Sequence, residues 1–553
     1  MTNNTLDAGK LRDRVQTLAT SAGIRHWDLG AACSDDCSVQ VDRGEVKQLK
    51  AAQRSSITVR VWNSDGLVGI TSTTDLTDTG LARALEGAQQ ASGFGNPDDV
   101  PQFSPMATDP LPHLDRPLMP RQGILPLLKN LRAAEAELLS RHPAIQTVPY
   151  NGLAESLSTN IYLNSDGAIR TMERTQASLY LYARAEESGR KPRSSGAIRM
   201  ALGSSDLDIQ GCIDEAVERT VSHLAYQPID TGSYRVCFTP EAFLSLIGAF
   251  SSMFSARAVL DGVSLSTRES LGLTLAVPFL SLEDDGLHPD HISASPFDGE
   301  GTPTQTLPLI ESGRLRNFLH SEATARAFGV KPTGHAGLGA KVSVGPDWFV
   351  VGTTPGQTSG QDLDHTRDTD TFVLIEDLSA LHAGVKATQG SFSLPFDGEG
   401  TPTQRLSLIE SGCLRNFLHS EATARAFGVK PTGHAGLGAK VSVGPDWFVV
   451  GTTPGQTSGQ ELDHTREADT FVLIEDLSAL HAGVKATQGS FSLPFDGWLV
   501  KGGERISVEA ATVAGDIRSL LTSILHLEPT QEVTHRGVAP HVWVEGLSIT
   551  GEA

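Results

Sequence analysis

The feature that most constrains this chain is a tandem repeat in its second half. The tetrapeptide that begins at Pro296 (Pro-Phe-Asp-Gly) returns at Pro395 and again at Pro494, a period of 99 residues. Solenoid repeats are shorter than this and diverge at their surfaces, so the pattern indicates one recent tandem duplication. We refer to 296–394 as copy one and to 395–493 as copy two. They differ at six positions: Thr306/Arg405, Pro308/Ser407, Arg314/Cys413, Asp362/Glu461, Asp368/Glu467 and Thr369/Ala468.

Composition restricts the classes of partner. The 553 residues, 39% of them hydrophobic, are enough for several domains, and removal of one copy would leave 454. The net charge of -21 argues against a nucleic-acid partner and against an anionic membrane surface. The polar segment 1–14 lacks the apolar stretch of a signal peptide, and no run of apolar residues is long enough for a transmembrane helix. Five cysteines in so long a chain are expected to be reduced thiols, so we predict a cytoplasmic location.

The first 230 residues have a mixed α and β pattern. Helical spacing predicts helices over 7–22, 79–92, 121–140 and 208–225. Alternating residues predict one hairpin of strands 55–62 and 67–71 and a second hairpin of strands 160–163 and 177–182. A proline-rich stretch separates the two halves. We therefore predict an N-terminal α/β domain (1–95), a linker (96–120) and a central α/β domain (121–230).

A C-terminal domain is predicted over 231–553. A buried strand (234–238) is followed by a helix start, with Thr239 as N-cap and Pro240 in the first turn. Apolar residues then form one stripe through Phe254. Short apolar runs (348–351, 371–375) between glycines and prolines indicate a turn-rich antiparallel β domain. The predicted fold class is α+β, with both copies inside the C-terminal domain.

Possible metal sites were considered first. None of the 17 histidines precedes a glutamate, so the sequence lacks the dipeptide of a helical zinc site. His288 and His291 follow the acidic run 283–285, but Pro289 and Gly286 place them on a loop. An acidic surface loop is therefore favoured over a metal site.

The remaining candidates are also weak. Cys33 and Cys37 lack redox spacing, and the glycine-rich run 334–339 lacks the Lys-Ser/Thr of a phosphate loop. Repeated histidines reflect the duplication and are interpreted as packing or surface residues: His320, His335, His365 and His382 in copy one, and His419, His434, His464 and His481 in copy two. We assign no catalytic, cofactor-binding or metal-binding residue.

Several segments, taken in order, resemble the TldD/PmbA family of peptidase subunits. In the C-terminal region these are 298–305 (DGEGTPTQ), 309–313 (LIESG), 332–335 (PTGH), 496–504 (DGWLVKGGE), 512–515 (TVAG) and 544–551 (VEGLSITG). In the N-terminal region they are 41–45 (VDRGE) and 69–73 (GITST). The resemblance spans nearly the whole chain, and the family length of about 450 residues matches the chain without one copy.

The resemblance implies a two-subunit metalloprotease of the cytoplasm. One subunit carries an H-E-x-x-x-H helix and a distant cysteine that hold zinc, whereas the other, called PmbA or TldE, lacks them. The corresponding helix here, 244–250, has neither His nor Glu, and 537–545 has no Cys. We therefore expect a PmbA/TldE-like subunit that acts on unfolded peptides or small proteins with a zinc-bearing TldD-like sibling. Two alternatives stay open: a stand-alone peptidase with an unrecognised site, and a peptide-binding regulatory protein.

Overall fold

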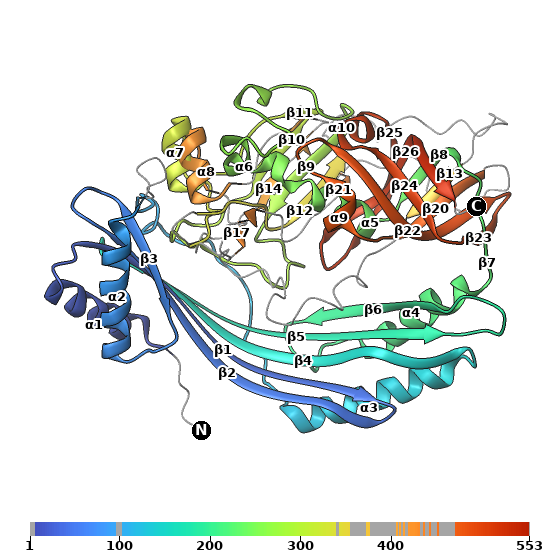
Figure 1. Cartoon of the computed structure of the whole chain (residues 1–553), viewed down its shortest axis with the longest axis horizontal. Helices are drawn as coiled ribbons and strands as arrows, with labels where there is room; N and C mark the ends of the chain where they lie inside the picture. The colour runs from blue at the N-terminus through green and yellow to red at the C-terminus, as the bar shows by residue number, and fades with distance from the viewer. Residues whose placement is uncertain are drawn as a thin grey trace.

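The computed structural model describes residues 6–95, 102–338, 342–353, 419–431 and 470–551, together with short backbone segments between 372 and 452. Its first half is one antiparallel sheet in the order β3-β2-β1-β4-β5-β6, whose long strands sweep across the lower part of Figure 1. The strands are β1 (His26–Asp42), β2 (Glu45–Trp62), β3 (Val68–Thr73), β4 (Ile145–Asn164), β5 (Ile169–Ala185) and β6 (Arg193–Ala201).

Two pairs of helices cover this sheet at different ends. α1 (Ala8–Ser21) and α2 (Asp78–Ser92) bury their apolar faces against β1 and β2, around the fully buried Trp27. α3 (Ile124–Arg141) and α4 (Ile209–Val221) pack against β4, β5 and β6. The predicted helices and both hairpins are confirmed, although α3 begins later than predicted, after Gly123 with φ 84°.

The sheet continues across the segment predicted to be a linker. β1 pairs with β2 on one side and with β4 on the other, for example Leu29 with Leu163. The first two regions therefore share one hydrogen-bonded sheet. The sequence patterns did not predict β1, because polar residues occupy much of its centre.

The C-terminal region forms a larger mixed sheet in the order β11-β10-β9-β12-β26-β8-β13-β20-β22-β23-β7, in the upper part of Figure 1. Most pairings are antiparallel as predicted, but β8 pairs in parallel with β13 and β20, and β12 with β26. The bounds are β7 (Tyr226–Gln227), β8 (Gly232–Phe238), β9 (Leu280–Asp285), β10 (Leu307–Glu311), β11 (Arg314–Leu315), β12 (Phe349–Thr353), β13 (Phe372–Ile375), β20 (Thr470–Leu477), β22 (Ser490–Lys501), β23 (Glu504–Val508) and β26 (Gly537–Gly551).

Further strands and helices complete this region. They are β14 (Arg405–Ser407), β15 (Ile409–Glu410), β16 (Cys413–Leu414), β17 (Ala435–Gly436), β18 (Ser442–Val443), β19 (Gly451–Thr452), β21 (Val484–Lys485), β24 (Ala511–Asp516), β25 (Ile524–Val533), α5 (Pro240–Ala249), α6 (Ala256–Leu260), α7 (Glu322–Phe328), α8 (Glu421–Phe427), α9 (Leu480–Gly483) and α10 (Ile517–Thr522). Short 3-10 turns lie at Ser222–Leu224, Ser251–Phe254 and Arg268–Ser270. In the part of the chain that is described, no helix is both long and apolar enough to cross a membrane.

α5 lies at the centre of the C-terminal core. The Thr239 hydroxyl accepts a hydrogen bond from the Ala242 N–H and so caps the helix, with Pro240 in the first turn, as predicted. Side chains from Ala242 to Ile247 are almost completely buried. The helix is thus apolar on nearly all sides, which is typical of a helix enclosed by a core.

Equivalent residues of the two copies occupy the same position in this sheet. Val373 of β13 and Val472 of β20, which are 99 residues apart, both pair in parallel with Val236 of β8. Helices α7 and α8 have the same sequence and also lie together (Figure 1). The duplication therefore encodes these strands and helices twice, whereas the fold has one position for each of them.

Candidate functional site

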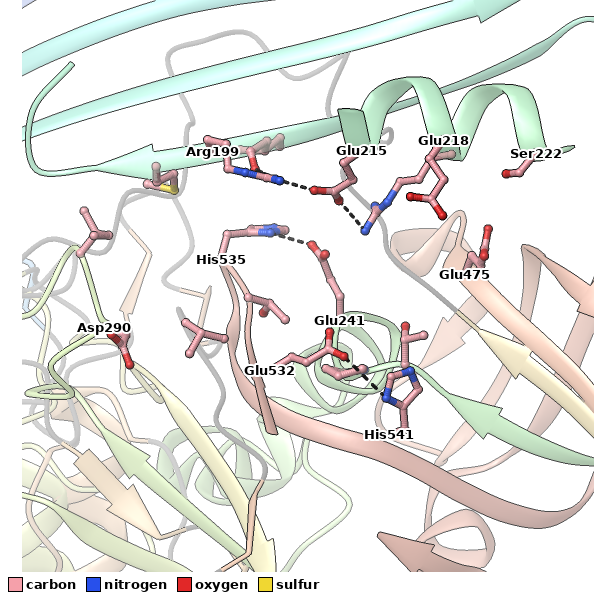
Figure 2. A pocket seen from close by; sticks show the side chains of 18 of the residues that line it. Arg199, Glu215, Glu218, Ser222, Glu241, Asp290, Glu475, Glu532, His535 and His541 are labelled. Atoms are coloured by element: carbon pink, nitrogen blue, oxygen red, sulfur yellow. Dashed lines mark hydrogen bonds and ion pairs between the residues drawn. The ribbon is translucent and has the colours of Figure 1, made fainter. Parts of the chain in front are cut away.

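A cavity of about 870 Å³ lies between the central region and the C-terminal region (Figure 2). Its upper wall in Figure 2 comes from β6 and α4, and its lower wall comes from the start of α5, from β20 and β22, and from the turn between β25 and β26. Of the two walls, only the lower one belongs to the C-terminal region, which contains the duplicated segment. Cavities of this size between structural units are common binding sites.

The start of α5 carries an ion pair that faces the cavity. Glu241 lies in the first turn, and its Oε1 is 2.6 Å from His535 Nδ1. Figure 2 shows the two side chains meeting on the C-terminal side of the cavity. A carboxylate in the first turn complements the positive end of the helix dipole, so Glu241 already compensates this end of α5.

A second imidazole, His541 of β26, lies beside two glutamates. Its Nδ1 is 3.7 Å from Glu528 Oε2 and 3.9 Å from Glu532 Oε1. The cavity walls withdraw water from Glu532, and this desolvation raises the pKa of its carboxyl although 57% of the side chain is exposed. Glu532 therefore releases its proton less readily than an ordinary surface glutamate does.

The third contact joins the two walls. Glu475 of β20 accepts hydrogen bonds from the Trp498 indole N–H and pairs with His223, which lies in the turn after α4. His223 Nδ1 is also 2.7 Å from the Ser507 hydroxyl, and its ring stacks on Trp498 with centroids 4.5 Å apart. These contacts hold α4 against the C-terminal sheet.

Acidic side chains outnumber basic ones around the cavity. The basic residues are Arg199, Arg219 and Arg505, and the acidic residues are Glu215, Glu218, Glu241, Asp290, Glu475 and Glu532. Two of the arginines share one carboxylate, because Arg199 and Arg219 lie 2.6 and 2.8 Å from Glu215. The cavity thus offers many hydrogen-bond donors and acceptors on two sides, which suits the main chain of an extended peptide.

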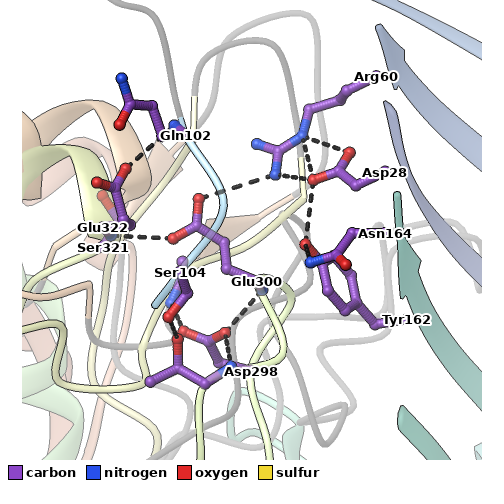
Figure 3. A network of polar contacts seen from close by, with 12 residues as sticks. Asp28, Arg60, Gln102, Ser104, Tyr162, Asn164, Asp298, Glu300, Ser321 and Glu322 are labelled. Atoms are coloured by element: carbon purple, nitrogen blue, oxygen red, sulfur yellow. Dashed lines mark hydrogen bonds and ion pairs between the residues drawn. The ribbon is translucent and has the colours of Figure 1, made fainter. Parts of the chain in front are cut away.

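A separate polar network joins the N-terminal sheet to copy one (Figure 3). Arg60 of β2 donates to both oxygens of Asp28 on β1, and Glu300 Oε1 lies 3.8 Å from the same guanidinium. All three side chains are fully buried. Burial raises the pKa of Asp28 despite the nearby Arg60, and Tyr162 donates a further hydrogen bond to Asp28 at 3.3 Å.

The loop that carries Glu300 is held by a carboxylate inside it. Asp298 accepts hydrogen bonds from the N–H groups of Glu300 (2.7 Å), Thr302 (2.8 Å) and Ala336 (3.1 Å). Burial, reinforced by the charge of Glu300, raises the pKa of Asp298 well above its ordinary value. Gly301 is required at the turn, because its φ is 74° and a Cβ there would lie 2.9 Å from Tyr162. The Asp-Gly-Glu-Gly motif therefore docks copy one onto the first sheet.

Asp284, Asp285 and His291 are buried, so the prediction of an acidic surface loop is wrong for them, whereas Asp290 is 54% exposed. Asp284 and Asp285 belong to β9 and are almost fully buried. Their carboxylate oxygens accept hydrogen bonds from the protein instead of from solvent. Asp284 Oδ2, for example, accepts the Asp347 N–H at 2.7 Å. The rings of His288 and His291 pack on Trp348, with centroids 5.5 and 4.4 Å from it. This is a packing cluster around a buried tryptophan.

The other sequence candidates lie apart from the cavity. Cys33 and Cys37 lie on β1 as free thiols, and burial raises the pKa of both. His320 and His335 are buried, and of the copy-two histidines only His419 and His481 are described. His365, His382, His434 and His464 lie outside the described residues, as does Gly339 of the glycine-rich run.

The cavity residues were not found from the sequence, because no short motif contains them. Glu241 and His535, for instance, meet only when β25 and β26 fold back over α5. Among the described residues, no group of three or more His, Cys, Asp or Glu side chains has the arrangement of a metal site. α5 could not supply ligands from its centre either, because Leu244, Leu246 and Ile247 lie there, buried in the core.

Three family models match the chain, one of them twice. The PmbA/TldA metallopeptidase domain 1 matches residues 34–92, and the central domain matches 124–224. The PmbA/TldA metallopeptidase C-terminal domain matches twice, over 231–395 and 389–551. Each of the latter matches contains one copy, so one C-terminal domain is encoded with a duplicated segment.

Individual relatives with similar sequences carry the name of the same family. The chain is 25% identical over 303 residues to the metalloprotease PmbA of Escherichia coli O157:H7, covering 50% of this chain and 64% of the relative. It is 22% identical to a metalloprotease PmbA homolog of Haemophilus influenzae over 58% of this chain and 71% of the relative. The chain thus spans slightly less than two thirds of the Escherichia coli protein.

Solved structures share the fold. TldE from Thermococcus kodakarensis superposes with a TM-score of 0.63 at 16% identity, covering 99% of this chain and all of that one. A proposed DNA gyrase modulator from Thermotoga maritima gives a TM-score of 0.69 at 20% identity, covering 98% of this chain and all of that one. At these identities, the similarity establishes the architecture alone.

Proposed function

Because this chain belongs to the PmbA/TldA metallopeptidase family, we propose that it is the PmbA/TldE-like, non-catalytic subunit of a cytoplasmic metalloprotease complex. A TldD-like sibling would hold the zinc and polarise the scissile carbonyl. This chain would complete the chamber and bind unfolded peptide in the cavity between its two regions. No step is assigned to zinc on this chain.

One observation carries the proposal. In α5, Glu241 is the single ionisable residue, and it is engaged with His535 at the edge of the cavity. The apolar side chains from Ala242 to Ile247 pack in the hydrophobic core. A helix of this composition lacks zinc ligands, yet the surrounding fold is that of a metallopeptidase family.

Co-expression with a zinc-bearing sibling tests the proposal. We expect the two chains to co-elute in size-exclusion chromatography at micromolar concentration, through an interface on the order of 2,000 Å² or more. We also expect the pair, but not this chain alone, to cleave an unfolded peptide in a chelator-sensitive manner. Separate elution would contradict the subunit role, and stoichiometric zinc with cleavage by this chain alone would favour the stand-alone peptidase.

A cavity-filling variant tests where the peptide binds. Ser222 lines the cavity, so Ser222→Trp should weaken the binding of a fluorescein-labelled unstructured peptide by about tenfold. Ser205→Trp adds the same side chain in an exposed turn and is the matched control. Equal binding by both variants would place the peptide elsewhere. Peptide binding without any association with the sibling would favour the regulatory alternative.

A further inference from the structure

A long edge of the first sheet has no partner strand. β3 pairs only with 57–62 of β2, so among the described residues no strand lies beside the outer edge of 45–56, the β2 edge. The inner edge of the same segment is paired with β1. The β2 edge extends about 40 Å and presents a row of backbone N–H and C=O groups. It lies along the border of the sheet that is farthest from the C-terminal region (Figure 1).

One face of the β2 edge is apolar. Val46 lies opposite Val41, and Leu49 lies opposite Val39. The two partners on β1 are fully buried in the cluster beneath α3, whereas Val46 and Leu49 are 41% and 47% exposed. The apolar layer beneath α3 therefore ends at the open edge, where the side chains of one more strand would cover it.

The opposite face of the β2 edge is basic. Lys50 lies opposite Ser38. Arg54 lies opposite Ser34 and 3.9 Å from Asp36. Because side chains alternate along a strand and Leu49 points toward α3, both cations point away from it. In a chain of net charge -21, this edge therefore suits an acidic partner strand.

We propose that the β2 edge pairs with an edge strand of the zinc-bearing sibling, so that the first sheets of the two subunits form one continuous sheet. This inference rests on the proposed function, because it locates the interface of the proposed pair. A sibling of the same fold has an equivalent edge, and two such edges pair antiparallel about an approximate twofold axis. The sibling's strand carries apolar side chains on the α3 side and acidic side chains on the side of Lys50 and Arg54.

A second copy of this chain fits the β2 edge less well. In the antiparallel registers that pair most of 45–56 with itself, Lys50 lies opposite or diagonal to Lys50 of the second copy. Like charges across a strand pair are destabilising. The charge on this edge therefore favours a heteromeric pair over a homodimer.

An interface at this edge leaves the cavity accessible to peptide. The cavity residues Ile198 and Met200 belong to β6, at the opposite border of the sheet. The twofold axis that relates two antiparallel strands of one sheet is perpendicular to that sheet, so each face stays on its own side. The inner faces of both subunits then border one shared space above the joined sheet.

Leu49→Glu tests the interface, because it places a carboxylate on the apolar face at a half-exposed position. We expect the affinity of the purified chain for the sibling, measured by isothermal titration calorimetry, to fall at least about tenfold. Leu118→Glu is the matched control, since Leu118 is 48% exposed and lies in the proline-rich stretch. It should bind as the parent does. Circular dichroism checks that both variants are folded.

Lys50→Glu tests the charge complementarity. It should weaken binding by about threefold, and the affinity of the variant should fall less than that of the parent when the salt concentration is raised from about 0.05 to 0.3 M. Lys485→Glu makes the same change of charge at an exposed position of the C-terminal region and should behave as the parent does.

Hydrogen exchange measures the strand pairing directly. Backbone amides within 45–56 should exchange more slowly in the pair than in the free chain. If the pair forms while exchange there is unchanged and Leu49→Glu binds as tightly as the parent, the proposal is overturned but the subunit role stands. If the two chains do not associate at all, both fail. Protection of 45–56 in a homodimer of this chain would identify a second copy as the occupant and would also overturn the proposal.

Discussion

Arg60 and Glu300, which come from the second strand of the first sheet and from the first loop of copy one, face each other with no exposure to solvent. The closest pair of charged atoms is 3.8 Å apart, and the Nε of the same guanidinium donates a hydrogen bond to Asp28. The contact fixes the duplicated segment to the N-terminal sheet and provides the first two predictions.

Arg60→Met should destabilise the protein by about 3–5 kcal/mol, because it leaves the buried Asp28 and Glu300 carboxylates without their cation. Arg54→Met is the matched control on the same strand, since its side chain is 47% exposed and lies 3.9 Å from Asp36. It should change the free energy of unfolding by less than about 0.5 kcal/mol. Urea unfolding measures both, and equal effects would show that the buried pair does not hold the two regions together.

Glu300→Ala tests how much the contact between copy one and the first sheet contributes to stability. Glu300 accepts the Glu322 N–H at 2.9 Å, so its loss should cost about 1–3 kcal/mol. Glu300→Gln keeps an acceptor oxygen at this position and should cost less than Glu300→Ala. Urea unfolding measures both variants, and an unchanged free energy of unfolding in Glu300→Ala would show that this contact does not stabilise the protein.

Stability should fall in mild acid, partly through His291. Burial lowers the pKa of this imidazole well below its ordinary 6.5, so the unfolded chain binds a proton that the folded chain does not. The stabilising contribution is therefore complete above pH 6.5 and is lost as the pH falls below it. Between pH 7.5 and 5.5, the loss of unfolding free energy should be smaller by about 1.4 kcal/mol in His291→Gln than in the parent. Equal losses in the two proteins would show that His291 is not kept neutral by the fold.

Deletion of 354–452 should give a folded chain of 454 residues with the first part of copy one and the last part of copy two. Closing a loop of about 100 residues costs roughly 4 kcal/mol, so removal of the segment should raise the melting temperature or leave it unchanged. Calorimetry and light scattering measure the melting temperature and the aggregation. An insoluble or unfolded product would mean that both copies are integral to the core.

Local signals predicted much of the fold. The cap at Thr239 and the hairpin turns were identified because glycine, proline and hydroxyl side chains act over a few residues. β1 escaped prediction because its position between β2 and β4 allows buried polar residues such as Asp28, which interrupt the apolar alternation. Asp28 is tolerated only because Arg60 faces it, and no property of 26–42 alone reveals that partner.

The cavity could not be predicted for a related reason. Its residues come from β6, α4, α5, β20 and β26, and only the packing of two regions brings them together. The histidine loop was misjudged because Asp284 and Asp285 looked like surface charges, whereas backbone N–H groups across the fold use them as acceptors. The family resemblance succeeded because several short segments recur in a fixed order, independently of the contacts they make.

The stacking of His223 on Trp498 gives the protein an optical reporter of its own. The indole lines the cavity, donates its N–H to Glu475 and lies against an imidazole from the opposite wall. Indole fluorescence is sensitive to the polarity around the ring and is quenched by an adjacent cationic imidazole. Any event that separates the two walls, or fills the space between them, therefore changes the emission of Trp498, and opening of the cavity can be followed in real time without an added dye.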